Sequence, residues 1–236
     1  MWGTVINSIA IIIGGSIGLL FRKRIKPNAA DDLKKALGIA LIVLAISGVI
    51  SNMFSVESGE LVSRDDFLMV ISIVIGTVAG ELLNLDGHIQ NLSIKIEKKA
   101  GINQFAKGFS SASIFFCVGA MAIIGSINDG LNGNISVLLM KSILDFSTGM
   151  ILATTLGVGV VFGCIPVFIY QGILTLFAGT LSNFLVGETL TSLCLVGYTI
   201  ILGIGIDMLG SVKIKTANML PSMLVPIIWA LVKPFF

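Results

Sequence analysis

The sequence contains few charged residues, few cysteines and almost no histidine. Asp, Glu, Lys and Arg make up 12% of its 236 residues, with three cysteines and one histidine. A soluble domain is about one-quarter charged, so this chain has too little charge to cover a soluble surface. Cys117, Cys164 and Cys194 stand singly in apolar runs, and His88 has no Cys or His neighbours. No disulfide, metal site or cofactor is therefore expected.

Catalytic motifs are also missing from the sequence. It contains no H-E-x-x-H motif, no Walker loop and no nucleophile–base–acid set. The glycine series at 157, 159 and 163 lacks the strand and the acidic residue of a dinucleotide fingerprint. The sequence therefore predicts a protein that is not an enzyme. Nucleic-acid binding is not expected either, because basic residues in short loops set membrane topology and contact anionic lipid headgroups.

Apolar residues dominate instead, at 55% of the chain, with a mean hydropathy of +1.01. The stretch from Ile135 to Ser182 carries two charges, Lys141 and Asp145. Since a helix needs about 20 residues to cross the hydrocarbon core, this stretch predicts two spans with a tight turn between them. The whole chain is expected to be one polytopic membrane domain over residues 1–236, an all-α integral membrane protein embedded in a lipid bilayer.

Basic residues gather in alternate loops, after the first, third and seventh predicted spans. Eight spans place these loops on the cytoplasmic side and both termini outside the bacterial cytoplasmic (inner) membrane. A single span in the central stretch would give seven and put the last basic loop on the wrong face. An interfacial amphipathic helix is expected at about 88–100. The predicted spans are approximately 4–21, 33–53, 67–85, 110–127, 135–152, 157–182, 189–209 and 217–232.

The first and third predicted spans resemble each other. Both carry isoleucines at matching positions and a G-x-x-x-G pattern, which the sixth span repeats. Such glycines let neighbouring helix backbones approach closely. One interpretation is a duplicated helix pair, spans one and two against spans three and four; the other is convergent composition. Such glycine faces would also allow copies of the chain to associate as a homo-oligomer. The predicted helix-packing glycines are Gly14, Gly18, Gly76, Gly80, Gly159 and Gly163.

Two charged residues lie inside the fifth predicted span. Lys141 and Asp145 are four residues apart and share one helix face. Unpaired ions in hydrocarbon are costly, so the pair is a candidate for lining a polar pathway. The alternatives are a pair that only neutralises itself and a Lys141 that extends outward to the headgroups.

The sixth and eighth predicted spans combine polar side chains with proline. Gln171 lies near the centre of the sixth span, beside Tyr170 and after Pro166. A proline-broken helix persists in a membrane only where protein or water satisfies the freed groups. A discontinuous sixth span is therefore a candidate solute site, and a simple packed kink is the alternative. Asn218 precedes Pro221 in a similar setting and could instead cap its helix.

Five motifs follow one another along the chain: the opening G-T-V-I-N-S, G-A-M-A-I-I-G-S-I-N-D-G (119–130), K-S-I-L-D (141–145), I-Y-Q-G (169–172) and N-M-L-P (218–221). With these motifs the chain resembles, over nearly its whole length, the bacterial multi-pass membrane family catalogued as domain of unknown function 554. The resemblance implies an inner-membrane protein of seven or eight helices with no established substrate.

Two functions fit these features. The first is a small transporter or channel for an ion or small polar solute, with a pathway in the region of predicted helices five and six. The second is a membrane scaffold or regulator that acts through its cytoplasmic amphipathic loop. The predicted pathway residues are Lys141, Asp145, Gln171, Tyr170, Pro166 and Asn218.

Overall fold

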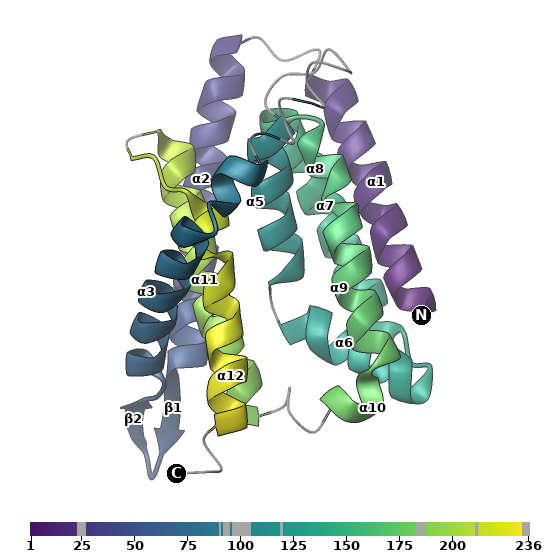
Figure 1. Cartoon of the computed structure of the whole chain (residues 1–236). Helices are drawn as coiled ribbons and strands as arrows, with labels where there is room; N and C mark the ends of the chain where they lie inside the picture. The colour runs from purple at the N-terminus through teal and green to yellow at the C-terminus, as the bar shows by residue number, and fades with distance from the viewer. Residues whose placement is uncertain are drawn as a thin grey trace. The chain divides into compact units, whose positions relative to one another are not determined.

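A computed structural model describes most of the chain, which is predominantly helical as predicted (Figure 1). The chain forms two compact units, and the single membrane domain over residues 1–236 stays a prediction. The first comprises Met1–Leu37 and Gly87–Leu181, and the second comprises Gly38–Asp86 and Ser182–Phe236. The described residues are 1–22, 27–89, 91, 95, 105–118, 120–182, 187–210 and 212–232.

The first unit is a helical bundle centred on two parallel helices, α1 and α7. Helices α8 and α9 pack against α1, α6 packs against α9 and α7, and α5 packs against α7 and α8 (Figure 1). The helices described for this unit are α1 (Trp2–Arg22), the start of α2 (Pro27–Met53), α5 (Phe105–Cys117), α6 (Ala120–Asn132), α7 (Ser136–Leu156), α8 (Gly159–Phe162), α9 (Cys164–Leu176) and α10 (Ala178–Leu181).

Two glycines set the spacing between α1 and α7. A Cβ atom on Gly14 would collide with the carbonyl oxygen of Phe146, and one on Gly18 would collide with that of Met150. Both residue numbers increase together along the interface, so the helices run in the same direction. The G-x-x-x-G pattern therefore brings the α1 and α7 backbones into direct contact.

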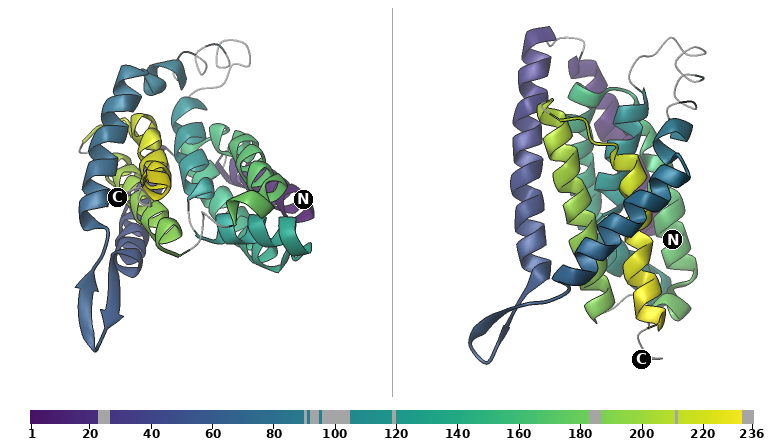
Figure 2. Two further views of the ribbon diagram at one scale, coloured as in Figure 1. Left: turned by 60° about the horizontal axis from the view of Figure 1, so that its bottom comes forward. Right: turned by 60° about the vertical axis from the view of Figure 1, so that its left-hand side comes forward.

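The second unit contains the only strands among the described residues. The predicted loop 54–66 forms a β-hairpin with Phe54 opposite Ser63, seen in Figure 2 beyond the ends of α2 and α3. Ser58 and Gly59 both have positive φ, as a two-residue hairpin turn requires. The all-helical prediction missed this hairpin. Its elements are the rest of α2, β1 (Phe54–Glu57), β2 (Glu60–Ser63), α3 (Asp66–Leu82), α11 (Gly187–Leu209), the 3₁₀ helix η1 (Thr216–Met223) and α12 (Leu224–Val232).

Glycines also set the spacing between α3 and η1. A Cβ on Gly76 would collide with the backbone of Ser222, and one on Gly80 with the carbonyl of Asn218. Here one residue number rises as the other falls, so the partner runs antiparallel. The similar sequences of α1 and α3 thus allow close packing in both cases, although the partner of α1 is parallel to it and the partner of α3 is antiparallel.

Four described helices are long and apolar enough to cross a membrane: α1, α7, α11 and the continuous segment from Gly159 to Leu176. The predicted span at 110–127 corresponds to α5 and α6, which are bent by 62° relative to each other and count as a fifth candidate if the bent pair is one span. The predicted interfacial helix at 88–100 lies largely outside the described residues.

Candidate functional site

An ion pair lies at the centre of the first unit. The Nζ atom of Lys141 lies 2.9 Å from Oδ2 of Asp145, and the two side chains are 7% and 4% exposed. Both residues are on α7, one turn apart, as their spacing predicted. The Lys141 side chain therefore turns inward to its partner and does not extend toward the headgroups. A pair this deeply buried needs further hydrogen bonds to offset its desolvation.

Asn7 supplies one of these bonds. Its Nδ2 atom donates to Oδ2 of Asp145 across 3.0 Å, because the glycine contacts hold α1 close to α7. A carboxylate only accepts hydrogen bonds, so this contact fixes the amide and points Oδ1 away from Asp145. Asn7 is completely buried. No described residue binds its Oδ1 atom.

Gln171 is also completely buried, on α9. Neither its Oε1 nor its Nε2 atom has a hydrogen-bond partner among the described residues. Native proteins pair the large majority of buried side-chain polar atoms, and each exception calls for an explanation. The buried amide is therefore, together with Oδ1 of Asn7 and Oγ of Ser126, a feature of this unit that packing among the described residues does not account for.

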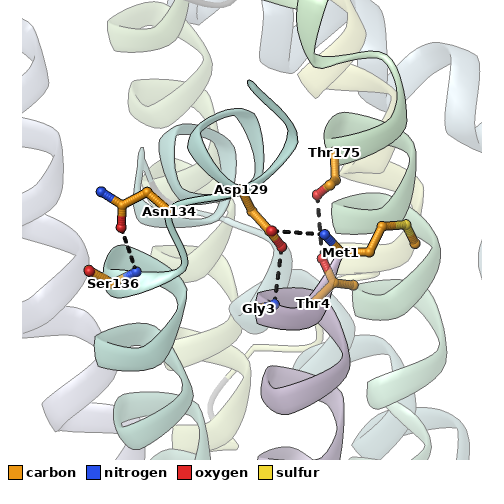
Figure 3. A network of polar contacts seen from close by, with 7 residues as sticks. All are labelled: Met1, Gly3, Thr4, Asp129, Asn134, Ser136 and Thr175. Carbon is orange, nitrogen blue, oxygen red and sulfur yellow. Dashed lines mark hydrogen bonds and ion pairs between the residues drawn. The ribbon is translucent and has the colours of Figure 1, made fainter. Parts of the chain in front are cut away.

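A contact between two threonines sets the register of α9 against α1. The hydroxyl oxygens of Thr4 and Thr175 lie 3.5 Å apart (Figure 3). Further along α1, a Cβ on Gly15 would lie 2.8 Å from Cγ2 of Val161, on α8. The two contacts make α1 antiparallel to the α8–α9 segment. One turn from the threonine pair, Asn7 on α1 therefore lies level with Gln171 on α9.

Asp129 connects α6 to the first turn of α1. Its Oδ2 atom accepts the backbone N–H of Gly3 across 3.0 Å, and its Oδ1 atom lies 2.8 Å from the amino group of Met1 (Figure 3). A carboxylate at this position satisfies an N–H group that the helix itself leaves free, and it suits the positive end of the helix dipole. The contact therefore joins the last turns of α6 to the start of α1.

Two of the predicted pathway residues lie beside Gln171. Tyr170 is half-buried on α9, and Pro166 is half-buried in its first turn. A proline there removes no intrahelical bond, because the N–H groups of a first turn have no partner in the helix. Gly163 separates α8 from α9 but keeps right-handed helical backbone angles. Gly159–Leu176 counts as one apolar helix, so a discontinuous sixth span stays a prediction.

The remaining predicted packing glycines also make close contacts. A Cβ on Gly159 would collide with the carbonyl oxygen of Phe105 on α5, and one on Gly163 would lie 3.2 Å from Cβ of Ala112. Within the described ranges, no cluster of three or more His, Cys, Asp or Glu side chains could hold a metal ion.

Asn218 belongs to the second unit and to a different polar cluster. Its Oδ1 atom accepts the backbone N–H of Asp86 across 2.7 Å, and its Nδ2 atom donates to Glu81. Lys215 lies 2.7 Å from the same carboxylate, and this hydrogen bond raises the pKa of Lys215. Asn218 therefore joins η1 to the end of α3 and does not cap its own helix.

We expect Asn218→Ala to destabilise the protein by about 1–3 kcal/mol, because two hydrogen bonds of a buried side chain are lost. Lys215→Ala is the matched control, since it removes a partner of the same Glu81 from an exposed pair and should have the smaller effect. Thermal unfolding in detergent measures both. A larger effect of the lysine variant would contradict this account.

Sequence reasoning missed Asn7 and Asp129. Asn7 was visible as an amide inside an apolar span, on one helix face with Thr4 and Ser8. Asp129 was noted only as part of the motif at 119–130. In both cases the signal was a polar side chain at helical spacing, and its partner lay far away in the sequence.

Comparison with known proteins identifies the family. A family model described as "Protein of unknown function (DUF554)" matches residues 2–231. The chain belongs to this family. It is similar to the "Uncharacterized membrane protein YdfK" of Bacillus subtilis (strain 168), with 33% identity over 226 residues, covering 96% of this chain and 94% of that protein.

A second DUF554-like relative is more distant. The "Uncharacterized protein YqgA" of Escherichia coli (strain K12) is 28% identical over 229 residues, which cover 94% of this chain and 93% of that protein. No solved structure matches the chain. The family match, the membrane-protein relative and the long apolar helices together identify a membrane protein and confirm the family resemblance.

Proposed function

We propose that this DUF554 protein is a small transporter or channel for an ion or small polar solute. The observation that supports it best is Gln171, a completely buried amide with neither polar atom paired within the described part of the chain. Polar groups in a membrane interior are costly and mark solute pathways. The nearby ion pair and Asn7 extend the polar surface across α7, α1 and α9. No catalytic step is part of this proposal.

The proposed topology has eight crossings of the bacterial cytoplasmic membrane, with both termini outside. The alternation of basic loops supports it, as do the four long apolar helices and the bent pair. The other crossings would use α2, α3 and the η1–α12 segment. The duplicated helix pair stays a prediction, supported by the shared glycine spacing of α1 and α3. Anionic lipid headgroups would contact the basic loops.

A cysteine-accessibility experiment tests this proposal without knowledge of the solute. Cys117, Cys164 and Cys194 are first replaced by alanine, and Gln171→Cys is then made in that background. If water reaches this position, a small neutral reagent such as methyl methanethiosulfonate should modify it at least about tenfold faster than a cysteine at a sealed site, because the thiolate forms only where water is present.

Val167→Cys is the matched control, because it lies one turn away on α9 and is also completely buried. Equal, negligible modification at both positions would contradict the transport proposal. It would favour the scaffold or regulator, which requires a dry interior and acts through a partner protein at the amphipathic loop.

A further inference from the structure

The hydrogen-bonding groups left free at the α1–α9 interface define what could bind there. They are Oδ1 of Asn7, which accepts, and the Gln171 amide, which accepts through Oε1 and donates through Nε2. A ligand that satisfies all three must both donate and accept hydrogen bonds. The register set by Thr4 with Thr175 places the two amides level with each other.

The charges around these groups already cancel. Lys141 is paired with Asp145 within α7, and Asp129 is paired with the amino group of Met1. A bound ion would therefore bring an uncompensated charge into a buried site. A cation would also use only the oxygens and leave Nε2 of Gln171 unpaired at further cost.

We propose that Asn7 and Gln171 form a binding site for a small uncharged molecule that both donates and accepts hydrogen bonds, of the size range from water to urea or acetamide. In this assignment the Lys141–Asp145 pair is a positioning group. Asp145 holds Nδ2 of Asn7, so that Oδ1 points away from Asp145 and stays free to accept. The inference rests on the proposed transport function and specifies its solute class.

Reconstituted vesicles test the solute class directly. Light scattering follows swelling in gradients of urea, acetamide, ammonium chloride and sodium chloride, together with osmotic water flow. We expect urea or acetamide to enter several-fold faster than into protein-free vesicles, with no increase for either salt. Water flow without uptake of urea or acetamide would still support an uncharged hydrogen-bonding solute, and it would restrict the solute to the size of water. Entry of a salt without either amide would overturn the assignment.

Variants at the two amides locate the site. Gln171→Met and Asn7→Leu keep side-chain volume but remove the hydrogen-bonding groups, and both should return uptake to the protein-free rate. Ser8→Ala and Gly172→Ala are matched controls that should keep it. The Ser8 hydroxyl is bound to the carbonyl of Thr4, and a Cβ on Gly172 has its nearest neighbour 3.9 Å away.

Stability separates a binding residue from a structural one. A buried amide with no partner disfavours the folded state, so Gln171→Met should raise the unfolding temperature by a few degrees in the absence of solute. A lower unfolding temperature would show that Gln171 is structural and overturn the assignment. Absence of uptake for every probe, with Gln171→Cys still accessible, rejects this solute class alone, whereas an inaccessible cysteine rejects the transport function.

Discussion

Replacing Lys141 alone with leucine is expected to destabilise the protein by about 3–5 kcal/mol, because it leaves a buried carboxylate without its counter-ion. Asp145 is 3% exposed and receives both the Lys141 ammonium and the Asn7 amide. After the substitution, Asn7 is the one described side chain still bound to this carboxylate. A neutral amide compensates a buried charge far less than an ammonium group does.

The double variant Lys141→Leu with Asp145→Leu should recover most of that loss, because replacing a buried ion pair by apolar side chains is often neutral or stabilising. Thermal unfolding in detergent can be followed with a thiol-reactive dye, since Cys194 is buried in the folded protein. Ser142→Ala is the control, because that hydroxyl is bound to the Leu138 carbonyl of its own helix. A double variant no more stable than Lys141→Leu alone would refute the pairing.

The same variants also bear on function. If the pair positions Asn7, the double variant should fold and yet lose solute uptake, because nothing then orients the Asn7 amide. A scaffold protein would show restored stability with no functional consequence of this kind. Stability and uptake therefore have to be measured on the same preparations.

Gly18→Ala should destabilise the protein strongly for so small a substitution, with an expected loss of about 3 kcal/mol. The added methyl group would meet the carbonyl oxygen of Met150 and lie 3.0 Å from Cβ of Ala153. Backbone atoms of a helix cannot turn aside as a flexible side chain can. The variant therefore forces α1 away from α7, and with it the Asn7–Asp145 contact.

Gly149→Ala is the matched control from the opposite helix of the same interface. A Cβ there would have Phe116 Cζ as its nearest neighbour, 3.5 Å away, which is ordinary van der Waals contact. It should fold normally, because alanine favours a helix more than glycine does. Equal unfolding temperatures for Gly18→Ala and Gly149→Ala would show that the α1–α7 spacing is not set by Gly18.

The candidate site was partly predictable from the sequence. The spacing of Lys141 and Asp145 predicts a shared helix face, since residues four apart on a helix are neighbours. Gln171 stood out as an amide in an apolar span. Asn7 could not be joined to them, because its partner Asp145 lies 138 residues away. The hydrogen bonds of Asn218 were equally invisible, because its partners Glu81 and Asp86 lie 137 and 132 residues away.

The bends and turns of the chain were likewise only partly predictable from the sequence. Pro166 drew attention to the sixth predicted span, but Gly159–Leu176 forms one apolar helix that passes from α8 to α9 at Gly163. The stretch at 110–127 contains no proline and gave no reason to expect the 62° bend between α5 and α6. The alternation of Phe54 to Glu57 is too short to predict a strand without its partner, because hairpin strands are stabilised by each other.

The amino-acid sequence by itself determined that this is a membrane protein, through its apolar length and scarce charge, and it placed Lys141 and Asp145 on one helix face. Those properties follow from composition and from the helical repeat, which act within a single segment. Only the tertiary structure decided which helices meet, that α1 and α3 approach partners of opposite direction, and that Asn7 and Gln171 lie level with each other. Such contacts depend on backbone approach between distant segments, and no local pattern encodes that distance.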